Sequence, residues 1–218
     1  MSKIFFIMGK SASGKDGVFS QILNKNIPGL KPVTIYTTRP MRDGEVQGRE
    51  YNFTDEDGLC EMRGKGLVIE ERVYHTVQGD WIYFTAADDT IGDIKRVKHP
   101  QTAETQDDGS SDPDNYIVIN TLEAYEKYLD YFGEEVMVPV YIYVDDDIRL
   151  IRAVERERQQ KNPDYKEVCR RFLADEDDFS EKKLTELHID SGHRFHNNGP
   201  IGDTVSKVEE FIRKIAVR

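Results

Sequence analysis

Short apolar runs and longer stretches of helical spacing alternate along this chain of 218 residues. Continuous apolar or β-branched runs, which predict buried strands, occupy residues 4–8, 116–120 and 138–144, with a shorter one at 194–198. Apolar residues recur every three or four positions in the segments between them, which predicts helices at residues 14–26, 121–132, 145–161, 164–188 and 202–217. Strands that alternate with helices predict a three-layer α/β/α fold, in which helices cover both faces of a parallel core sheet.

The middle of the chain departs from this alternation. We expect a short strand at residues 33–36, a helix at 55–66, and a hairpin of strands 67–74 and 81–85 joined by a Gly79-Asp80 turn. Residues 33–87 are therefore predicted to form an inserted mixed lobe, while residues 1–32 and 116–218 form the core. Residues 88–115 are dominated by Asp, Gly, Ser, Thr and Pro, which predicts a mobile acidic insertion with no assigned chemistry.

A glycine loop lies between the first strand and the first helix. Gly9, Gly14 and Lys15 fit the pattern G-x-x-x-x-G-K, whose glycines let successive backbone N–H groups curl around a phosphate. The following helix N-terminus adds partial positive charge, and Lys15 would bridge the β- and γ-phosphates of a nucleoside triphosphate. The predicted ATP-binding segment is Gly9, Lys10, Ser11, Ala12, Ser13, Gly14, Lys15 and Asp16. A plain turn with a surface lysine is the alternative, and the strand before it and the helix after it argue against that interpretation.

Charge and cysteine content narrow the function classes. The chain has 41 acidic and 30 basic residues and a net charge of -11, so binding along a nucleic acid backbone is not expected. Its two cysteines, Cys60 and Cys169, lie far apart, and we expect both to pack as small apolar side chains in a reducing compartment. The run at 4–8 is too short for a signal peptide or a membrane span, which predicts a cytoplasmic protein with no membrane partner. A monomer and a homodimer both stay open.

Arginines are concentrated in two stretches despite this acidic balance. One is the loop 37–53, T-T-R-P-x-R-x-G-E-x-x-G-x-x-Y-x-F, in which Arg39 and Arg42 are close enough to bind one phosphate. The other stretch contains Arg152, Arg156, Arg158, Arg170 and Arg171 on two predicted helices. Either stretch alone is also typical of a solvated charged surface.

The arginine loop resembles the GMP-binding signature of guanylate kinases, which are P-loop nucleoside monophosphate kinases. Together with the glycine loop, this resemblance covers most of the chain, with its main gap at residues 86–115. It implies that Arg39, Arg42 and Tyr51 bind the phosphate of the acceptor. It also implies that Glu45 orients these arginines or a metal-bound water near them.

Other positions acquire roles through the same resemblance. On the hairpin, Glu70 matches a base-reading glutamate, Tyr83 matches a phosphate-binding tyrosine, and Thr85 matches the hydroxyl residue two positions later, although Phe84 stands where the family has glycine. Without the resemblance, Glu70 would be interpreted as an exposed strand residue. Asn197 matches a strand-end asparagine near the adenine of the donor. An arginine-bearing lid is implied at about residues 152–172, and the implied catalytic residues are Lys15, Arg39, Arg152, Arg156 and Arg171.

The chain departs from the family pattern at base-reading and metal positions. Asn120 and Leu122 stand where the family has Asp-x-Asp, with Glu123 as the nearest carboxylate, and Ile35 lies in the stretch of a guanine-contacting serine. Asp16 replaces the hydroxyl residue that normally ends the glycine-loop pattern. We hypothesise that its carboxylate holds Mg²⁺ directly or through water. The alternative, that Asp16 only complements the helix dipole, stays equally open.

These features predict phosphoryl transfer from ATP to GMP or dGMP, which yields GDP or dGDP, with Mg²⁺ as cofactor and small nucleotides as ligands. A kinase of the same fold for another phosphorylated acceptor, a different nucleotide or a ribose phosphate, is a close alternative because base-reading groups are missing. A non-catalytic guanylate-kinase-like domain that binds protein ligands is the third hypothesis. The retained Gly9, Gly14 and Lys15 argue against it.

Overall fold

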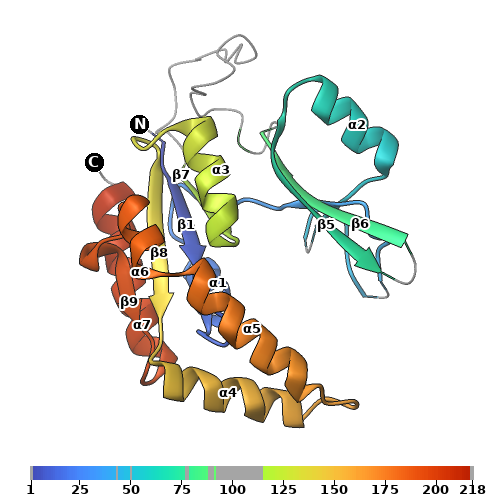
Figure 1. The fold of residues 1–218 in the computed structure, drawn as a ribbon. Coiled ribbons are helices and arrows are strands. Elements are labelled where there is room, and N and C mark those ends of the chain that lie inside the picture. Colours follow the sequence, from blue (N-terminus) through green and yellow to red (C-terminus); the bar gives the residue numbers. More distant parts are fainter. Residues whose placement is uncertain are drawn as a thin grey trace.

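The structure is a computed structural model that describes residues 2–42, 44–49, 51–76, 79–87, 91 and 115–216. Its elements form a core and a lobe beside it (Figure 1). The core contains β1 (Ile4–Met8), α1 (Lys15–Asn24), β2 (Leu30–Pro32), β7 (Asn115–Ile119), α3 (Leu122–Phe132), β8 (Met137–Tyr143), α4 (Asp146–Arg158), α5 (Tyr165–Asp178), α6 (Glu181–Glu186), a 3-10 turn (Ser191–His193), β9 (Arg194–His196) and α7 (Ile201–Ala216). The lobe contains β3 (Tyr36–Thr37), β4 (Asn52–Phe53), α2 (Glu56–Gly64), β5 (Val68–Thr76) and β6 (Gly79–Ala86).

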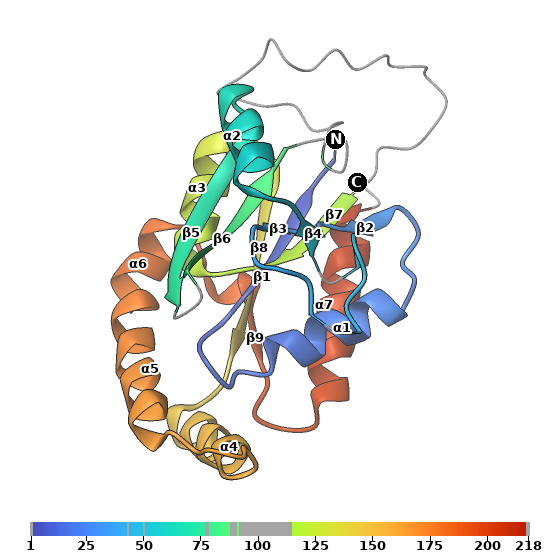
Figure 2. The ribbon, with the colours of Figure 1, turned by 90° about the vertical axis from the view of Figure 1, so that its right-hand side faces the viewer.

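The core sheet is parallel, with the strand order β2-β7-β1-β8-β9. All residues of its central strand, β1, are buried, because helices cover both faces of the sheet. Ile4, Phe6 and Met8 pack with residues of α3 and α6, while Phe5 and Ile7 pack with residues of α1 and α7. Figure 2 shows these helix pairs on opposite sides of the strands. The predicted three-layer α/β/α fold is thereby confirmed.

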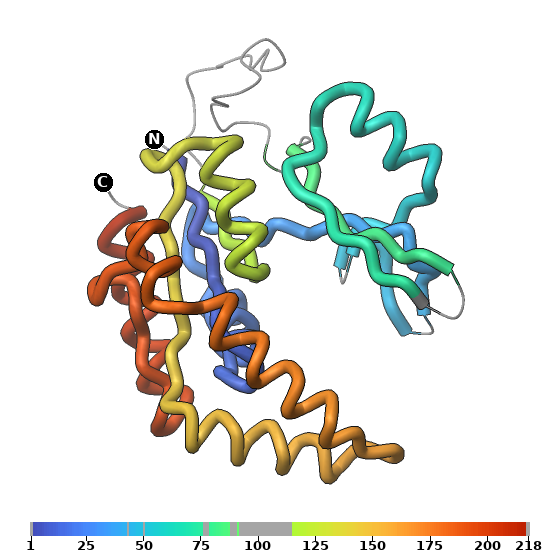
Figure 3. The backbone as a smooth tube through the Cα atoms, viewed as in Figure 1, coloured from blue at the N-terminus to red at the C-terminus, as the bar shows by residue number. Residues whose placement is uncertain are grey.

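The lobe is a mixed sheet with the order β4-β3-β6-β5. Strand β3 is parallel to β4 and antiparallel to β6, and β5 and β6 form an antiparallel hairpin. Helix α2 covers one face through Leu59, which packs with Phe84 and Ala86. Phe84, at the family's glycine position, is completely buried and stacks on Tyr36, so it fills the lobe's own small core. Figure 3 shows the chain leaving the core after β2 and crossing to this lobe.

Three local expectations were wrong. The strand predicted at 33–36 is absent, since β2 ends at Pro32 and β3 begins at Tyr36; Val33 still donates to Ile117 O over 2.9 Å, and the chain then leaves the core sheet. Gly79 and Asp80 pair with Thr76 and His75 and so belong to the hairpin strands rather than to its turn. Cys60 and Cys169 are exposed instead of packed in apolar surroundings.

The helical stretch predicted at 164–188 is two helices. Helix α5 ends at Asp178, and the side chain of Phe179 turns into the core to stack on Tyr141, with ring centroids 5.5 Å apart. Helix α6 then restarts at Glu181. Most of the predicted insertion at 88–115 lies outside the described residues. Among the residues that are described, we find no helix that combines the length and apolarity a bilayer crossing requires.

Candidate functional site

The glycine loop joins β1 to α1 in a conformation that requires glycine at two positions. A Cβ on Gly9 would lie 2.6 Å from Ile142 O, so no larger residue fits there. Gly14 has a φ of 82° and a Cβ on it would lie 2.6 Å from Asn197 Nδ2. Gly14 caps α1 without any side-chain hydrogen bond, so the first-turn N–H groups keep their partial positive charge unopposed by a cap. This geometry favours binding of an anion at the loop.

Lys15 and Ser13 are polar side chains of this loop that differ in exposure. Lys15 is 25% exposed at its side chain and its Nζ lies 3.5 Å from a carboxylate oxygen of Asp16, which is itself 83% exposed. The hydroxyl of Ser13 is buried and has no hydrogen-bond partner among the described residues. A buried hydroxyl without a partner is a group that a bound ligand or water would satisfy.

Asn197, directly after β9, is hydrogen-bonded to the glycine loop. Its Nδ2 donates to Ser13 O over 2.8 Å, and its Oδ1 accepts a hydrogen bond from Thr204 Oγ1 over 3.0 Å. Its own backbone carbonyl accepts from Arg152 Nη1 over 2.9 Å. Asn197 and Arg152 are thus engaged in positioning the loop against the end of β9, and the amide of Asn197 does not point freely toward a donor base.

The acceptor residues predicted from the arginine loop come together around Arg39, which is only 3% exposed. Its Nε donates to Tyr83 Oη over 3.2 Å and its Nη2 donates to Glu45 Oε1 over 2.7 Å. The other oxygen of Glu45 accepts from the backbone N–H of Arg42 over 2.7 Å. The guanidinium also lies over the ring of Tyr51, 5.4 Å from its centroid. Glu45 therefore orients Arg39 directly, and fixes Arg42 through its backbone.

The charges in this cluster reinforce one another. The hydrogen bond to Glu45 raises the pKa of Arg39, and the same bond, followed by the bond from the Arg42 amide, lowers the pKa of the Glu45 carboxyl. Burial raises the pKa of Tyr51, so its hydroxyl stays a donor. Arg39 uses three of its five N–H donors within the protein, which leaves one on each terminal nitrogen for a phosphate.

One cavity of about 950 Å³ extends from the glycine loop to the lobe, where Tyr51 lines it but Arg39 and Arg42 do not. Gly9, Lys15 and Asp16 line it on the glycine-loop side, and Tyr51 and Arg72 line it on the lobe side. A cavity of this size is in the range of nucleotide-sized ligand sites. The position of Arg72 in its wall was not anticipated from the sequence, because no motif includes this residue.

The hairpin residues lie where the lobe meets the core. Glu70 is buried, so it is not the exposed strand residue that it resembles when taken alone. Its Oε1 accepts from Thr85 Oγ1 over 2.9 Å and from Asn120 Nδ2 over 3.0 Å. Thr85 thus bonds to Glu70, while Tyr83, two residues before it, bonds to Arg39.

The structure does not bring all the predicted lid arginines to the cavity. Arg156 and Arg171 are exposed and do not line it. Arg171 instead donates to Glu167 over 2.6 Å, and Arg170 and Arg171 together lower the pKa of Glu167 to about 2. Figure 1 shows α4 and α5 as a pair of helices that extends away from the core sheet.

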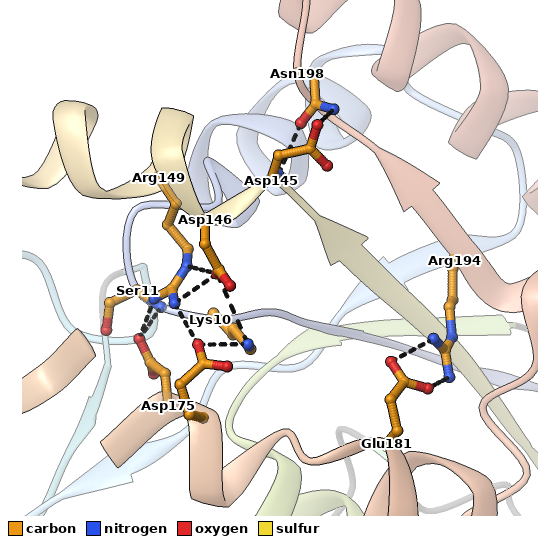
Figure 4. A network of polar contacts seen from close by, with 10 residues as sticks. Lys10, Ser11, Asp145, Asp146, Arg149, Asp175, Glu181, Arg194 and Asn198 are labelled. Atoms are coloured by element: carbon orange, nitrogen blue, oxygen red, sulfur yellow. Dashed lines mark hydrogen bonds and ion pairs between the residues drawn. The ribbon is translucent and has the colours of Figure 1, made fainter. Parts of the chain in front are cut away.

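A buried arginine that sequence reasoning missed connects these lid helices to the glycine loop (Figure 4). Arg149, on α4, is 1% exposed; its Nη1 donates to Asp175 over 2.8 Å and its Nη2 donates to Glu176 over 2.7 Å. The same Asp175 oxygen accepts from the Ser11 amide over 2.9 Å, and Lys10 Nζ donates to Glu176 over 2.7 Å. The only available signal was the Asp146–Arg149 spacing, which is common on any helix surface.

The carboxylates near the glycine loop fit Mg²⁺ bound together with phosphates. Asp16 and Glu123 both line the cavity, and carboxylate oxygen is the ligand type that Mg²⁺ prefers. Within the described part of the chain, no group of three or more His, Cys, Asp or Glu residues could hold a metal alone. Mg²⁺ in kinases is commonly held by one or two carboxylates plus substrate phosphates, so the donor set here suits that mode.

Comparisons with known proteins agree with this geometry. The guanylate kinase family model matches residues 1–96. A solved structure of guanylate kinase from Anaplasma phagocytophilum superposes with a TM-score of 0.54 at 16% identity, covering 100% of this chain and 87% of that one. The chain is similar to guanylate kinases in the sequence of residues 1–96 and in its fold. At 16% identity, the structural similarity shows only a shared fold. The family model matches the N-terminal part of the chain, which contains the glycine loop and the Arg39 cluster.

The curated relatives divide by how much of the chain they match. A guanylate kinase from Rhodopseudomonas palustris is 42% identical over 67 residues, which cover 31% of this chain and 30% of that protein. The chain therefore spans about a third of the length of the first curated guanylate kinases that it matches. A dephospho-CoA kinase from Oceanobacillus iheyensis is 23% identical over 98% of both chains.

Proposed function

We propose that the protein transfers the γ-phosphoryl group of ATP to a nucleoside monophosphate, with GMP or dGMP as the acceptor and GDP or dGDP as the product. The observation that carries this proposal is the single cavity of about 950 Å³, lined by the glycine loop on one side and by Tyr51 and Arg72 on the other. Two anionic ligands bound there would meet end to end. Small nucleotides, rather than a polymer, are then its ligands.

The residues act by positioning and by neutralising charge. The first-turn amides of α1 and Lys15 would bind the phosphates of ATP, while Arg39, Arg42 and Tyr51 would bind the acceptor phosphate. The attacking phosphate oxygen is already ionised, so the reaction needs no general base. The two ligands held in line turn a bimolecular encounter into a step within one complex.

Asp16 would hold Mg²⁺ together with the phosphates of ATP, with Glu123 in the same cavity. When bound, Mg²⁺ supplies charge neutralisation for the phosphate oxygens. Calorimetric titration of ATP with and without Mg²⁺ tests this role. The substitution Asp16→Asn should remove most of the gain in ATP affinity that Mg²⁺ confers, and an undiminished gain would contradict it.

A second candidate is a kinase of the same fold for another phosphorylated acceptor, such as a ribose phosphate. Two features favour it: Asn120 replaces a carboxylate, and apolar Ile35 lines the cavity where a hydroxyl residue would contact guanine. The phosphate cluster around Arg39 would serve either acceptor equally well. The acceptors of the two candidate functions differ only in the part that lies away from the phosphate, where a nucleotide has its base.

A coupled assay of ADP release distinguishes them when it is run with a panel of nucleoside monophosphates and ribose phosphates. Turnover of GMP and dGMP supports the proposal, whereas turnover of ribose phosphates alone supports the second candidate. Lys15→Met should abolish turnover. The matched control is Lys182→Met, because Lys182, on α6, is 84% exposed at its side chain and does not line the cavity. ADP release that persists unchanged in Lys15→Met would contradict both kinase assignments.

A further inference from the structure

Where the lobe meets the core, three side chains surround the carboxylate of Glu70. Thr85 and Asn120 donate to Oε1 over 2.9 and 3.0 Å, and Arg72 Nε donates to Oε2 over 3.1 Å. Asn120 comes from the end of β7, so this group joins the core sheet to the hairpin of the lobe. The side chain of Glu70 is only 3% exposed.

These bonds leave Glu70 little capacity to read a base. A carboxylate has about four acceptor positions, and three of them are occupied by protein donors. Guanine presents both N1–H and N2–H₂ on one edge, so a carboxylate that reads guanine must accept two bonds at once. Glu70 could do so only by giving up a buried hydrogen bond.

Asn120 explains why this arrangement is stable. Its Oδ1 accepts from the Thr121 amide over 2.9 Å, which leaves Nδ2 as the donor toward Glu70. An aspartate at this position would place a second carboxylate against Glu70 in a buried site, where both could not stay ionised. An amide at position 120 is therefore compatible with a buried, ionised Glu70.

Arg72 is one of the polar groups that line the cavity, together with Arg49, Asn120 and Glu123 among others. Only its Nε has a hydrogen-bond partner among the described residues, so both terminal nitrogens keep their donors. Arg72 lines the cavity, and its side chain is 19% exposed. It lies opposite Tyr83 on the hairpin, and Tyr83 bonds to Arg39 of the phosphate cluster. Along the hairpin, Arg72 pairs with Tyr83 and Glu70 pairs with Thr85, so Arg72 is the nearer of the two in register to the Tyr83–Arg39 bond.

We infer that Arg72, and not Glu70, reads the base of the acceptor, and that it reads a hydrogen-bond-accepting edge. This inference rests on the proposed function and narrows its substrate class to 6-oxopurine nucleoside monophosphates. A guanidinium donates two bonds to O6 and N7 of guanine, which is the commonest specific arginine–base contact. Adenine carries a donor, N6–H₂, in place of O6 and so opposes it.

Hypoxanthine has the same O6 and N7 as guanine and lacks only the 2-amino group. Glu70 is committed to protein donors, so where Arg72 alone reads the base, GMP and IMP become nearly equivalent acceptors. An enzyme that read guanine through Glu70 would instead reject IMP, since removal of a group that a buried site is built to bond is heavily penalised. The ratio of these two substrates therefore separates the two modes of recognition.

The test is kcat/KM for GMP, IMP and AMP at saturating ATP. The wild type should use GMP and IMP within about threefold and AMP at least about tenfold less well, since one good bidentate contact discriminates by roughly that factor or more. Glutamine pairs with adenine N6 and N7, so Arg72→Gln should raise the AMP-to-GMP ratio at least about tenfold. A merely structural role for Arg72 would lower all three values together and leave that ratio unchanged. Arg63→Gln is the matched control, because Arg63 is an exposed lobe arginine paired with Glu71.

The outcomes distinguish this inference from the function on which it rests. Good turnover of GMP with IMP more than about thirtyfold worse, and loss of that preference in Glu70→Gln, would overturn the inference and leave the kinase proposal standing. An unchanged AMP-to-GMP ratio in Arg72→Gln would also overturn it. If ribose phosphates react and no nucleotide does, or if nothing reacts, the proposed acceptor class fails and the inference fails with it.

Discussion

The guanidinium of Arg149 donates to Asp175 over 2.8 Å, and the same carboxylate oxygen accepts from the Ser11 amide over 2.9 Å. One oxygen of Asp175, on α5, therefore joins Arg149 of α4 to the glycine loop. Asp146 and Glu176 also bond to Arg149, which makes it the shared cation of three carboxylates. Its guanidinium lies 4.0 Å from the ring centroid of Phe172, which covers it from α5.

Removal of that cation should be costly. Arg149→Met leaves Asp175 without its buried cation, although Lys10 still pairs with Glu176, and we expect the free energy of unfolding to fall by about 3 kcal/mol. The double variant Arg149→Met/Asp175→Leu removes a charge from each side and should recover part of the loss. Urea unfolding followed by circular dichroism measures both. Equal stability of Arg149→Met and the wild type would show that the network adds nothing.

Substitutions at Gly14 and Gly29 distinguish the energetic cost of a positive φ from the cost of a steric clash. Both have positive φ, 82° and 69°, but a methyl group added at Gly14 would meet the Nδ2 of Asn197, whereas one added at Gly29 would meet nothing within 4 Å. Gly29→Ala should cost about 1 kcal/mol of folding free energy from the backbone alone. Gly14→Ala should cost more, because the methyl group would displace Asn197 from Ser13, and it should also weaken ATP binding. Calorimetric ATP affinity and urea melts of both variants check this, and equal effects of the two would contradict it.

The Asn120–Glu70 pair predicts an unusual pH dependence for Asn120→Asp. The new carboxylate would lie against Glu70, and the repulsion would raise the folded-state pKa of one of the two above its unfolded value. The folded variant then binds more protons than the unfolded chain, so its stability should decrease as pH rises from about 4 to 8. Asn115→Asp, at the other end of β7, is the control, since the donor to Asn115 Oδ1 among the described residues is the Lys3 amide rather than a group next to a carboxylate. Parallel stability profiles for the two variants would argue against close carboxylates.

The contribution of Glu45 to stability should increase with pH, which is opposite to the pH dependence expected for Asn120→Asp. Its hydrogen bond to Arg39 lowers its pKa in the folded state, so the contribution is full above the ordinary glutamate pKa of about 4.3 and is lost as pH falls through the lowered value. The wild type should therefore lose stability more steeply than Glu45→Gln between about pH 5 and pH 3. Urea melts across that range measure the difference. Identical slopes would mean that this bond does not persist in solution.

Elements with local signals could be predicted from the sequence. The apolar run of β1, the Thr121 cap of α3 and the Asn162-Pro163 break between α4 and α5 all depend on residues close together in the chain. The prediction of a strand at 33–36 was wrong. Val33 is buried because the chain leaves the core sheet at this point, and the hydrophobic pattern does not show where a chain leaves a sheet. Short strands such as β3 exist only through their pairing with β4 and β6.

The site was predictable to the extent that its motifs are contiguous. The glycine loop and the Arg39–Glu45 contact lie within short segments, and both were anticipated. The Glu70–Asn120 bond joins residues 50 positions apart, and the Arg149 network draws on three segments. No spacing rule connects such residues. Arg156 and Arg171 are exposed and do not line the cavity in this structure. Their expected approach to the phosphates therefore stays a prediction.

The central claim is that two anionic ligands occupy one cavity end to end, and a ligand that carries both tests it most directly. Adenosine and guanosine joined through five phosphates should bind once per chain in calorimetry, roughly a hundredfold tighter than GMP, because its second half binds at high effective concentration. ATP and GMP should each compete with it, and Lys15→Met and Arg39→Lys should each weaken it. Two molecules bound per chain, or competition by ATP with none by GMP, would contradict a shared cavity.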